Sequence, residues 1–450
     1  MTVLAAPGAA ATRSILVPSQ GRSIRRRPIR RAGARRLPLI VATVSVVVAG
    51  GLVPAGAAAA EVIEPVCPQA SAFRGIEIVP TAALSVPDPH AETSISSGAL
   101  PAGVTLVDGV FSGVPTATGI SSFTLEARFT DAPMKTVACT VGVDPAPTPS
   151  RITGSDRYDQ AVKVTRSAFP TGGIDVLYLA SGEKFSDALS AGSVAGVHGA
   201  PLLLTQSGTL PAVTKAEITR LAPKDIVVVG GTASVSAAVF GGLKSAFAAA
   251  NVHRVAGADR FDVSRSLISH PTFGVPSSAW VYLATGVDFP DALAASPAAV
   301  SVNGPVMLVD GSQPTVSAAD LALLTSLKAT SVRIAGGRAS VTDGIQRQLA
   351  VSGYAVTRAE GADRYQAAVS VNREAFLSAT TVYLASGTAF ADALSAAPIA
   401  GKNSAPIYLV PSTCVPASVL QEIVRVHPKN IVVLGGYSTL NADIDALKPC

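Results

Sequence analysis

The most regular hydrophobic pattern in the chain is a short β-branched run that ends at a glycine turn and leads into an acidic helix start. It occurs three times, at Val176–Gly192, Val281–Ala295 and Val382–Ala397, and each copy passes through a Phe into Asp-Ala-Leu. The run is too short for a helix, which predicts a buried central strand. Its period of about a hundred residues indicates a duplicated domain, because solenoid repeats are about 20 to 50 residues long.

Each copy carries further apolar segments in the same order. Ahead of the central strand in the first copy, Tyr158, Ala161 and Thr165 follow one another at helical spacing behind Asp156, whose carboxylate is suited to cap that helix. The counterparts of Asp156 are Asp259 and Asp363. Two more strands and a helix between them follow: Pro201–Thr205, Ala212–Leu221 and Ile226–Val229 in the first copy, Pro305–Val309, Val316–Leu327 and Val332–Ala335 in the second, and Pro406–Val410, Ala417–Val426 and Ile431–Leu434 in the third. Strands alternating with helices predict a parallel, doubly wound α/β sheet in each repeat.

The helix after the central strand is expected to begin just behind the glycine turn. Pro290 lies there in the second copy, and proline is tolerated in the first turn of a helix but not later. This places one aspartate of each copy near the positive end of the helix dipole. These aspartates are Asp187, Asp291 and Asp392.

The last predicted strand of each copy ends in two glycines. The pairs are Gly230 and Gly231, Gly336 and Gly337, and Gly435 and Gly436. None has the G-x-G-x-x-G or G-x-x-x-x-G-K-[ST] context of a phosphate loop, so a turn with positive φ is favoured. Open α/β sheets nevertheless bind ligands at helix N-termini beside strand carboxyl ends, and each repeat could offer a shallow anion site. The strand tyrosines Tyr178, Tyr282 and Tyr383 are interpreted as core and not as sugar platforms.

Ahead of the repeats, residues 61–143 show short runs that alternate between apolar and polar positions and are separated by turn residues. The runs are Phe73–Val79, Leu100–Leu106, Val110–Val114 and Phe123–Arg128. This spacing predicts an all-β sandwich. Residues 144–150 are rich in proline and predict a semi-rigid linker.

The charge of the chain is distributed unevenly, with an excess of basic residues at the amino terminus. The formal net charge is +5, but nine of the 35 basic residues lie within residues 1–60, which contain no acidic residue. The remainder carries 26 basic and 30 acidic residues, which argues against broad binding to nucleic acid. Arg22–Arg36, the apolar run Leu37–Val53 and the small residues Ala55–Ala60 follow the order of a secretory signal peptide. We expect residues 1–60 to be removed and the mature chain to be exported without a membrane span; an uncleaved anchor is the alternative.

An exported chain permits disulfides, and the sequence contains four cysteines. Four cysteines allow three pairings. Pairing of Cys67 with Cys139 and of Cys414 with Cys450 keeps each bond within one domain, and it is the one we expect. The chain has no C-x-x-C or H-E-x-x-H spacing, so the sequence predicts no metal site, and it indicates no cofactor.

The repeats resemble the type 2 cell wall binding repeat family of Gram-positive surface proteins and autolysins. The matching motifs are G-[SA]-D-R-[YF], the strand with its F-x-D-A-L centre, and the strand ending in Gly-Gly, all in register over residues 151–450. The resemblance implies a triplet of domains, residues 151–251, 252–355 and 356–450, packed with pseudo-threefold symmetry and holding the protein non-covalently to anionic wall polymers. Residues 61–143 resemble the immunoglobulin-like domains of bacterial surface proteins, whose motifs say little about a ligand.

Two charged positions of the family signature are candidates for contact with the polymer. They are Arg157, Arg260 and Arg364 of the opening motif, and Asp187, Asp291 and Asp392 of the centre. A guanidinium fork suits a phosphate or a carboxylate of the polymer. The same arginines could instead pair with the aspartates, within a repeat or across to the next, and we favour this structural pairing. In the third copy the acidic Glu360 could weaken an anion site.

These features predict an exported, non-enzymatic protein that attaches to the cell wall through three polymer-binding repeats. Three weak sites on one rigid unit gain avidity through effective concentration. Two alternatives stay open. One is wall hydrolysis of the N-acetylmuramoyl-L-alanine amidase kind, although the sequence lacks the zinc-ligand pattern that this chemistry needs. The other is adhesion, with the immunoglobulin-like domain binding a protein or glycan partner.

Overall fold

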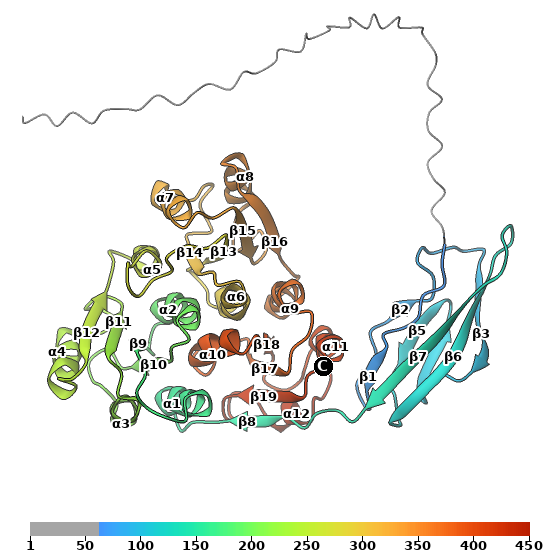
Figure 1. Cartoon of the computed structure of the whole chain (residues 1–450), viewed down its shortest axis with the longest axis horizontal. Coiled ribbons are helices and arrows are strands. Elements are labelled where there is room, and N and C mark those ends of the chain that lie inside the picture. The colour runs from blue at the N-terminus through green and yellow to red at the C-terminus, as the bar shows by residue number, and fades with distance from the viewer. Residues whose placement is uncertain (1–62) are drawn as a thin grey trace, which may run out of the picture. The chain divides into compact units, whose positions relative to one another are not determined.

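Each repeat folds around its β-branched apolar run, which forms a central strand of a parallel four-stranded sheet (Figure 1). The computed structural model describes residues 63–450, and the predicted leader, residues 1–60, lies outside them. Within the described residues, no helix has both the length and the apolar character needed to cross a membrane. The central strands are β9 (Val176–Ser181), β13 (Trp280–Thr285) and β17 (Thr381–Ser386).

The strand order is the same in all three sheets. The first sheet runs β10 (Leu202–Thr205), β9, β11 (Asp225–Val229), β12 (Asn251–Val255). The second runs β14 (Val306–Val309), β13, β15 (Ser331–Ala335), β16 (Ala355–Ala359), and the third runs β18 (Ile407–Val410), β17, β19 (Asn430–Leu434), β8 (Ser150–Ile152). Every pair in these sheets is parallel, which confirms the predicted α/β class.

The helix that opens each repeat begins directly after the aspartate predicted to cap it. The carboxylates of Asp156, Asp259 and Asp363 each accept hydrogen bonds from two backbone N–H groups of the first turn. These helices are α1 (Arg157–Ala168), α5 (Arg260–Ile268) and α9 (Arg364–Ala375). The remaining outer helices are α3 (Ala212–Leu221), α4 (Ala237–Ala246), α7 (Ala318–Ser326), α8 (Asp343–Val351), α11 (Ala417–Val426) and α12 (Ala442–Asp445).

The last strand of each sheet comes from the segment that leads into the next repeat. β12 completes the first sheet although most of it lies in the span predicted for the second domain, and β16 completes the second sheet in the same way. β8, at the start of the first repeat, pairs with β19 and completes the third sheet. Each repeat therefore supplies the edge strand of the sheet of the repeat before it, and the first repeat supplies that of the third, so the three repeats form a closed ring. These strands were not predicted, because they are partly exposed edge strands without an apolar run.

Three helices pack against one another where the repeats meet (Figure 1). They are α2 (Phe185–Val197), α6 (Pro290–Ser301) and α10 (Ala397–Lys402), the last preceded by the 3₁₀ helix η1 (Leu394–Ala396). Close packing requires glycine, since a Cβ atom on Gly196 or on Gly401 would collide with Val300. Pro290 lies in the first turn of α6 as predicted, whereas Asp392 lies in a turn ahead of η1.

Residues 63–143 fold as the predicted all-β region. One sheet has the order β1 (Ser71–Phe73), β7 (Lys135–Asp144), β6 (Gly119–Arg128), β3 (Glu92–Gly98), and the other β2 (Thr81–Ala82), β5 (Val110–Gly113), β4 (Val104–Val107). All pairs except β1 with β7 are antiparallel. Phe111, Phe123 and Leu125 lie in the core of this region. The strand predicted over Phe73–Val79 was wrong beyond Phe73, the last residue of β1, because the chain turns at Arg74 and Gly75. The largely polar β3 was not predicted, and the immunoglobulin-like resemblance stays a prediction.

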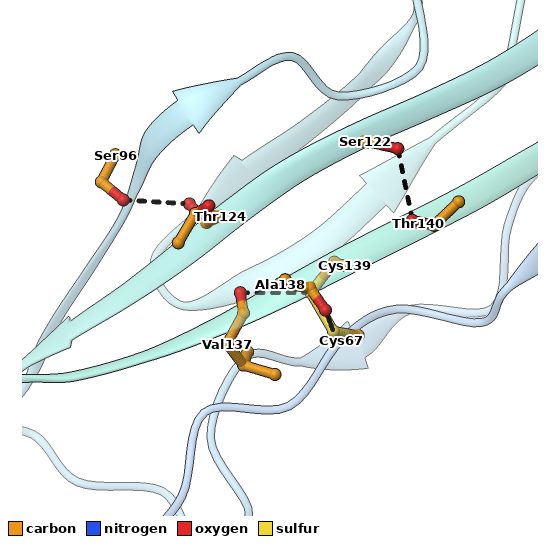
Figure 2. Close-up of a disulfide and its surroundings, with 8 residues drawn as sticks. All are labelled: Cys67, Ser96, Ser122, Thr124, Val137, Ala138, Cys139 and Thr140. Atoms are coloured by element: carbon orange, nitrogen blue, oxygen red, sulfur yellow. Dashed lines mark hydrogen bonds between the residues drawn. A yellow bond between two sulfur atoms is a disulfide. The ribbon is translucent and has the colours of Figure 1, made fainter.

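All four cysteines are paired in disulfides. Cys67 is bonded to Cys139, which joins the segment ahead of β1 to β7 (Figure 2). Cys414 is bonded to Cys450, which joins the loop after β18 to the last residue of the chain. Each bond links parts of the same domain and crosses no domain boundary.

Candidate functional site

The three signature arginines lie at the carboxyl ends of the central strands. Each is the first residue of its helix, and its Nη1 atom donates a hydrogen bond to the carbonyl oxygen of the glycine that follows the central strand. The pairs are Arg157 with Gly182 at 2.6 Å, Arg260 with Gly286 at 2.8 Å, and Arg364 with Gly387 at 2.5 Å. Within residues 63–450, Arg157 and Arg260 form no other side-chain hydrogen bond, so their remaining donors are available to a ligand.

Each arginine also reaches across to the neighbouring repeat. Its guanidinium lies over the phenylalanine of the F-x-D-A-L motif there, within the range of a cation–π interaction. The pairs are Arg157 with Phe390 at 5.8 Å, Arg260 with Phe185 at 5.8 Å, and Arg364 with Phe289 at 5.9 Å. The three rings contact one another, with centroids 5.6 to 6.1 Å apart, and so mark the pseudo-threefold axis.

The three signature aspartates have structural partners inside their own repeats. A hydroxyl group in the turn after the glycine pair neighbours each carboxylate and lowers its pKa: Ser234 for Asp187, Ser340 for Asp291, and Thr439 for Asp392. Each also packs against the first glycine of the pair, where any Cβ atom would collide with its Oδ2 atom. That glycine has a φ of +114° at Gly230, +109° at Gly336 and +110° at Gly435. The first glycine is therefore required by both the turn and the carboxylate.

Arginine and aspartate of the signature are not joined by an ion pair anywhere in residues 63–450. The charge of each arginine instead acts at longer range on the aspartate of the preceding repeat: Arg260 on Asp187, Arg364 on Asp291, and Arg157 on Asp392. Burial raises the pKa of all three aspartates, and the hydroxyl hydrogen bond and the arginine lower it by less. Each site is thus shared between two repeats. We call these three sites the first junction (Asp187 and Arg260), the second junction (Asp291 and Arg364) and the third junction (Asp392 and Arg157).

A pocket of about 210 Å³ opens at one of these junctions, between the second and third repeats. Its lining includes Asp288, Asp291, Ser340, Asp363 and Arg364. Nη2 of Arg364 lies 3.8 Å from a carboxylate oxygen of Asp288. The pocket can offer a guanidinium to an anion and carboxylate oxygens to the hydroxyl groups of a sugar.

Sequence reasoning missed a second set of repeated arginines that hold the glycine turns. Each donates from Nη1 to the carbonyl oxygen of the first glycine of a pair: Arg151 to Gly435, Arg254 to Gly230, and Arg358 to Gly336. These arginines lie on the edge strands, so they connect each turn to the repeat that follows it. The signal was present in the sequence as the recurring spacing R-x-x-G-x-D-R.

The structure also bears on two other kinds of site, a metal site and a sugar platform built from the strand tyrosines. Among the described residues, no cluster of three His, Cys, Asp or Glu side chains could hold a metal ion. The strand tyrosines are core residues, as predicted, with exposed fractions of 0% for Tyr178, 4% for Tyr282 and 6% for Tyr383.

Some known proteins resemble the repeats in sequence, and some solved structures share their fold. The chain is 25% identical over 294 residues to N-acetylmuramoyl-L-alanine amidase LytC of Bacillus subtilis (strain 168), covering 65% of this chain and 56% of LytC. It is 30% identical over 268 residues to the amidase enhancer of the same organism, covering 60% of this chain and 35% of that protein. The chain thus spans less than two thirds of either relative.

Two solved structures from Clostridium difficile share the fold. Cwp8 has a TM-score of 0.60 at 24% identity, over 73% of this chain and 58% of that chain, and Cwp6 has a TM-score of 0.61 at 20% identity, over 86% and 68%. The model of cell wall binding domain 2 (CWB2) matches residues 151–240, 254–346 and 358–445, one match per repeat. Because these matches cover more than half of the chain, it belongs to the CWB2 family, whose repeats bind cell wall polymers.

Proposed function

We propose that the protein is exported and attaches non-covalently to the cell wall by binding an anionic wall polymer through Arg157, Arg260 and Arg364. One observation carries this proposal: at each of the three junctions, the guanidinium of the equivalent arginine lies over the phenylalanine ring of a neighbouring repeat. An anionic polymer repeats its charge many times along one chain. Three equivalent cations on one rigid unit can engage it together, and the effective concentration of the second and third sites makes weak contacts add up to tight attachment.

The contacts of the aspartates support this role for the arginines. Asp187 and Asp392 lie beside hydroxyl groups of their own repeats, and among the described residues the facing Arg260 and Arg157 have no carboxylate in direct contact. A phosphate or carboxylate of the polymer would supply the missing partner through charge-assisted hydrogen bonds. Asp288 stands 3.8 Å from Arg364, so the junction between the second and third repeats is the weakest of the three for an anion.

We infer a binding role without catalysis. The curated relatives include an amidase, but the chain spans only part of their length. The carboxylate of each junction aspartate lies beside a hydroxyl group and packs against a glycine turn, and this environment suits a structural role better than proton transfer. The arginines offer positive charge and hydrogen-bond donors to the polymer. Binding through these groups breaks no bond of the polymer.

Binding of the full chain to purified wall tests the proposal. Intact wall is compared with wall from which the anionic polymers have been stripped, and the fraction of protein that sediments with each is measured over a range of salt concentrations. Sedimentation with intact wall, its loss on stripped wall and its decline at high salt are the expected results. Equal binding to both preparations would show that the anionic polymers are not the ligand.

A further inference from the structure

Tyr437 stands out among the aromatic residues of the chain because its ring faces solvent. It follows the Gly435–Gly436 pair in the turn after β19, and 62% of its surface is exposed. Among the described residues, Trp280 is the other Phe, Tyr or Trp side chain that is exposed, at 37%. A large aromatic ring held in water on one junction of a binding module suggests a contact surface.

The ring of Tyr437 is supported from beneath. The guanidinium carbon of Arg151 lies 4.3 Å from the ring centre, in a cation–π contact. Arg151 itself is fixed: Nη1 donates to the carbonyl oxygens of Gly435 and Leu440, Nη2 forms an ion pair with Asp445 at 2.8 Å, and its side chain is 8% exposed. One face of the ring therefore rests on a rigid support, and little ordering entropy is lost when a ligand covers the other face.

The other two junctions lack this arrangement. The positions that correspond to Tyr437 are Thr232 in the first repeat and Arg338 in the second. Arg338 is held by ion pairs with Asp343 and Glu360, each at 3.1 Å. The arginine that corresponds to Arg151 in the first sheet, Arg254, lies over Phe240 instead, at 4.7 Å. An exposed aromatic ring supported by an arginine therefore occurs at this position in the third repeat and not at the equivalent positions of the other two.

The surroundings of Tyr437 belong to the third and first repeats together. A Cβ atom on Gly436 would lie 3.0 Å from Oγ1 of Thr153, at the start of the first repeat, and Asp392 packs on Gly435. The position before the junction phenylalanine carries Lys184 or Asp288 at the other junctions but the uncharged Ala389 here. An aromatic face, a hydroxyl group and the guanidinium of Arg157 thus occur at one junction without a competing surface carboxylate at that position.

We propose that Tyr437 is a platform on which a pyranose ring of the wall polysaccharide stacks. A pyranose ring has an apolar face of C–H groups and a rim of hydroxyl groups, which matches an aromatic face with polar neighbours. This inference rests on the proposed function, because it adds a sugar subsite to a module that binds wall polymer. The sugar can belong to the anionic polymer or to the glycan strands of the wall, and the two sources are separated by stripping.

The test compares the full chain with Tyr437→Ala and Tyr437→Phe for sedimentation with intact wall and with stripped wall. Leu377→Ala is the matched control, since Leu377 is an exposed apolar residue of the third repeat, 84% exposed, with no part in a junction. We expect Tyr437→Ala to weaken binding about tenfold, while Tyr437→Phe stays within about twofold of the native chain because it keeps the ring face. Melting temperatures of all variants should agree closely, because both positions are exposed.

Each outcome has one meaning. Native binding by Tyr437→Ala overturns the platform while leaving the proposed function intact, and equal losses in Tyr437→Ala and Tyr437→Phe overturn it in favour of a contact through the hydroxyl group. Failure of the native chain to bind wall of either kind overturns the proposed function and the platform together. If Tyr437→Ala weakens binding to intact wall, the residual binding to stripped wall gives the source of the sugar. Loss of the native chain's residual binding to stripped wall in Tyr437→Ala assigns the sugar to the glycan strands, and a loss confined to intact wall assigns it to the anionic polymer.

Discussion

The guanidinium of Arg157, at the start of the first repeat, lies 5.8 Å from the ring centre of Phe390 in the third. Together with the pairing of β8 and β19, this contact joins the beginning of the repeat module to its end. The third sheet is complete only when the first repeat supplies its edge strand. Stability of the last repeat should therefore depend on residues that lie almost three hundred positions earlier in the chain.

Arg151→Ala tests this dependence. Arg151 donates to Gly435, Leu440 and Asn441 and forms an ion pair with Asp445, so the substitution leaves several carbonyl oxygens and a carboxylate without partners. We expect a loss of about 2 to 4 kcal/mol in the free energy of unfolding, measured by denaturant titration. Arg338→Ala is the control, because the side chain of Arg338 is 64% exposed and its ion pairs should contribute about 1 kcal/mol or less. Equal effects of the two substitutions would contradict the closure.

The glycine pair of the first repeat offers a comparison between adjacent residues. Gly230 has a φ of +114° and packs against Asp187, whereas a Cβ atom on Gly231 would meet no atom within 4 Å. Gly230→Ala should lower the free energy of unfolding by about 2 kcal/mol or more, since strain and collision act together. Gly231→Ala should change it by no more than about 0.5 kcal/mol. Thermal unfolding of both variants measures the difference, and similar losses at the two positions would argue against a role for Asp187 in the turn.

How far the sequence predicted this architecture depends on the kind of signal each element carries. The central strands and the caps at Asp156, Asp259 and Asp363 were predicted, because apolar β-branched runs and an N-cap aspartate are local signals. The edge strand β8 was not, because Ser150–Ile152 is partly exposed and gains its place from pairing with a strand far along the chain. Such non-local pairing leaves no periodic trace in the sequence.

In the candidate site, too, the sequence predicted the features that depend on local signals and missed those that depend on how the repeats pack. The repeated motifs singled out Arg157, Arg260 and Arg364, and the structure has them at the carboxyl ends of the central strands. They gave no sign that each arginine contacts a ring of another repeat, because that contact depends on how the repeats pack. The hydroxyl partners of the aspartates, Ser234, Ser340 and Thr439, recur four residues after the first glycine, a spacing that becomes meaningful once the turn is seen.

The pH dependence of stability separates the effect of burial on Asp187 from the effect of its attraction to the charge of Arg260. Burial outweighs the hydrogen bond from Ser234 and the charges of Lys184 and Arg260, and it raises the pKa of Asp187 above 3.8. A carboxyl group whose pKa is higher in the folded state contributes stability below its ordinary pKa and loses it as the pH rises through the raised value. We therefore expect Asp187→Asn to melt above the native chain at pH 7, with a gap that closes toward pH 3.8. A lower melting point at pH 7 would show that attraction to Arg260 dominates.

A zymogram on purified wall tests the absence of hydrolysis. The full chain is run in a gel that contains intact wall, renatured and incubated with and without added zinc, next to a known wall amidase as a positive control. We expect a clear band from the amidase alone. A clearing band at the size of this chain would replace the binding role with catalysis.

Wall binding by variants that lose the junction charges one, two and three at a time tests whether the three arginines hold the polymer. Arg157→Gln, Arg260→Gln and Arg364→Gln are combined stepwise, and the control chain carries Lys224→Gln, Lys328→Gln and Lys429→Gln, which remove one exposed lysine from each repeat. We expect loss of Arg157 or of Arg260 to weaken binding to intact wall by about tenfold each, on the order of 1.5 kcal/mol for a charge-assisted hydrogen bond. Loss of Arg364 should weaken it less, because Asp288 already lies 3.8 Å from that guanidinium, and the lysine control should bind like the native chain. A folded triple arginine variant that binds intact wall as tightly as the lysine control would contradict the account.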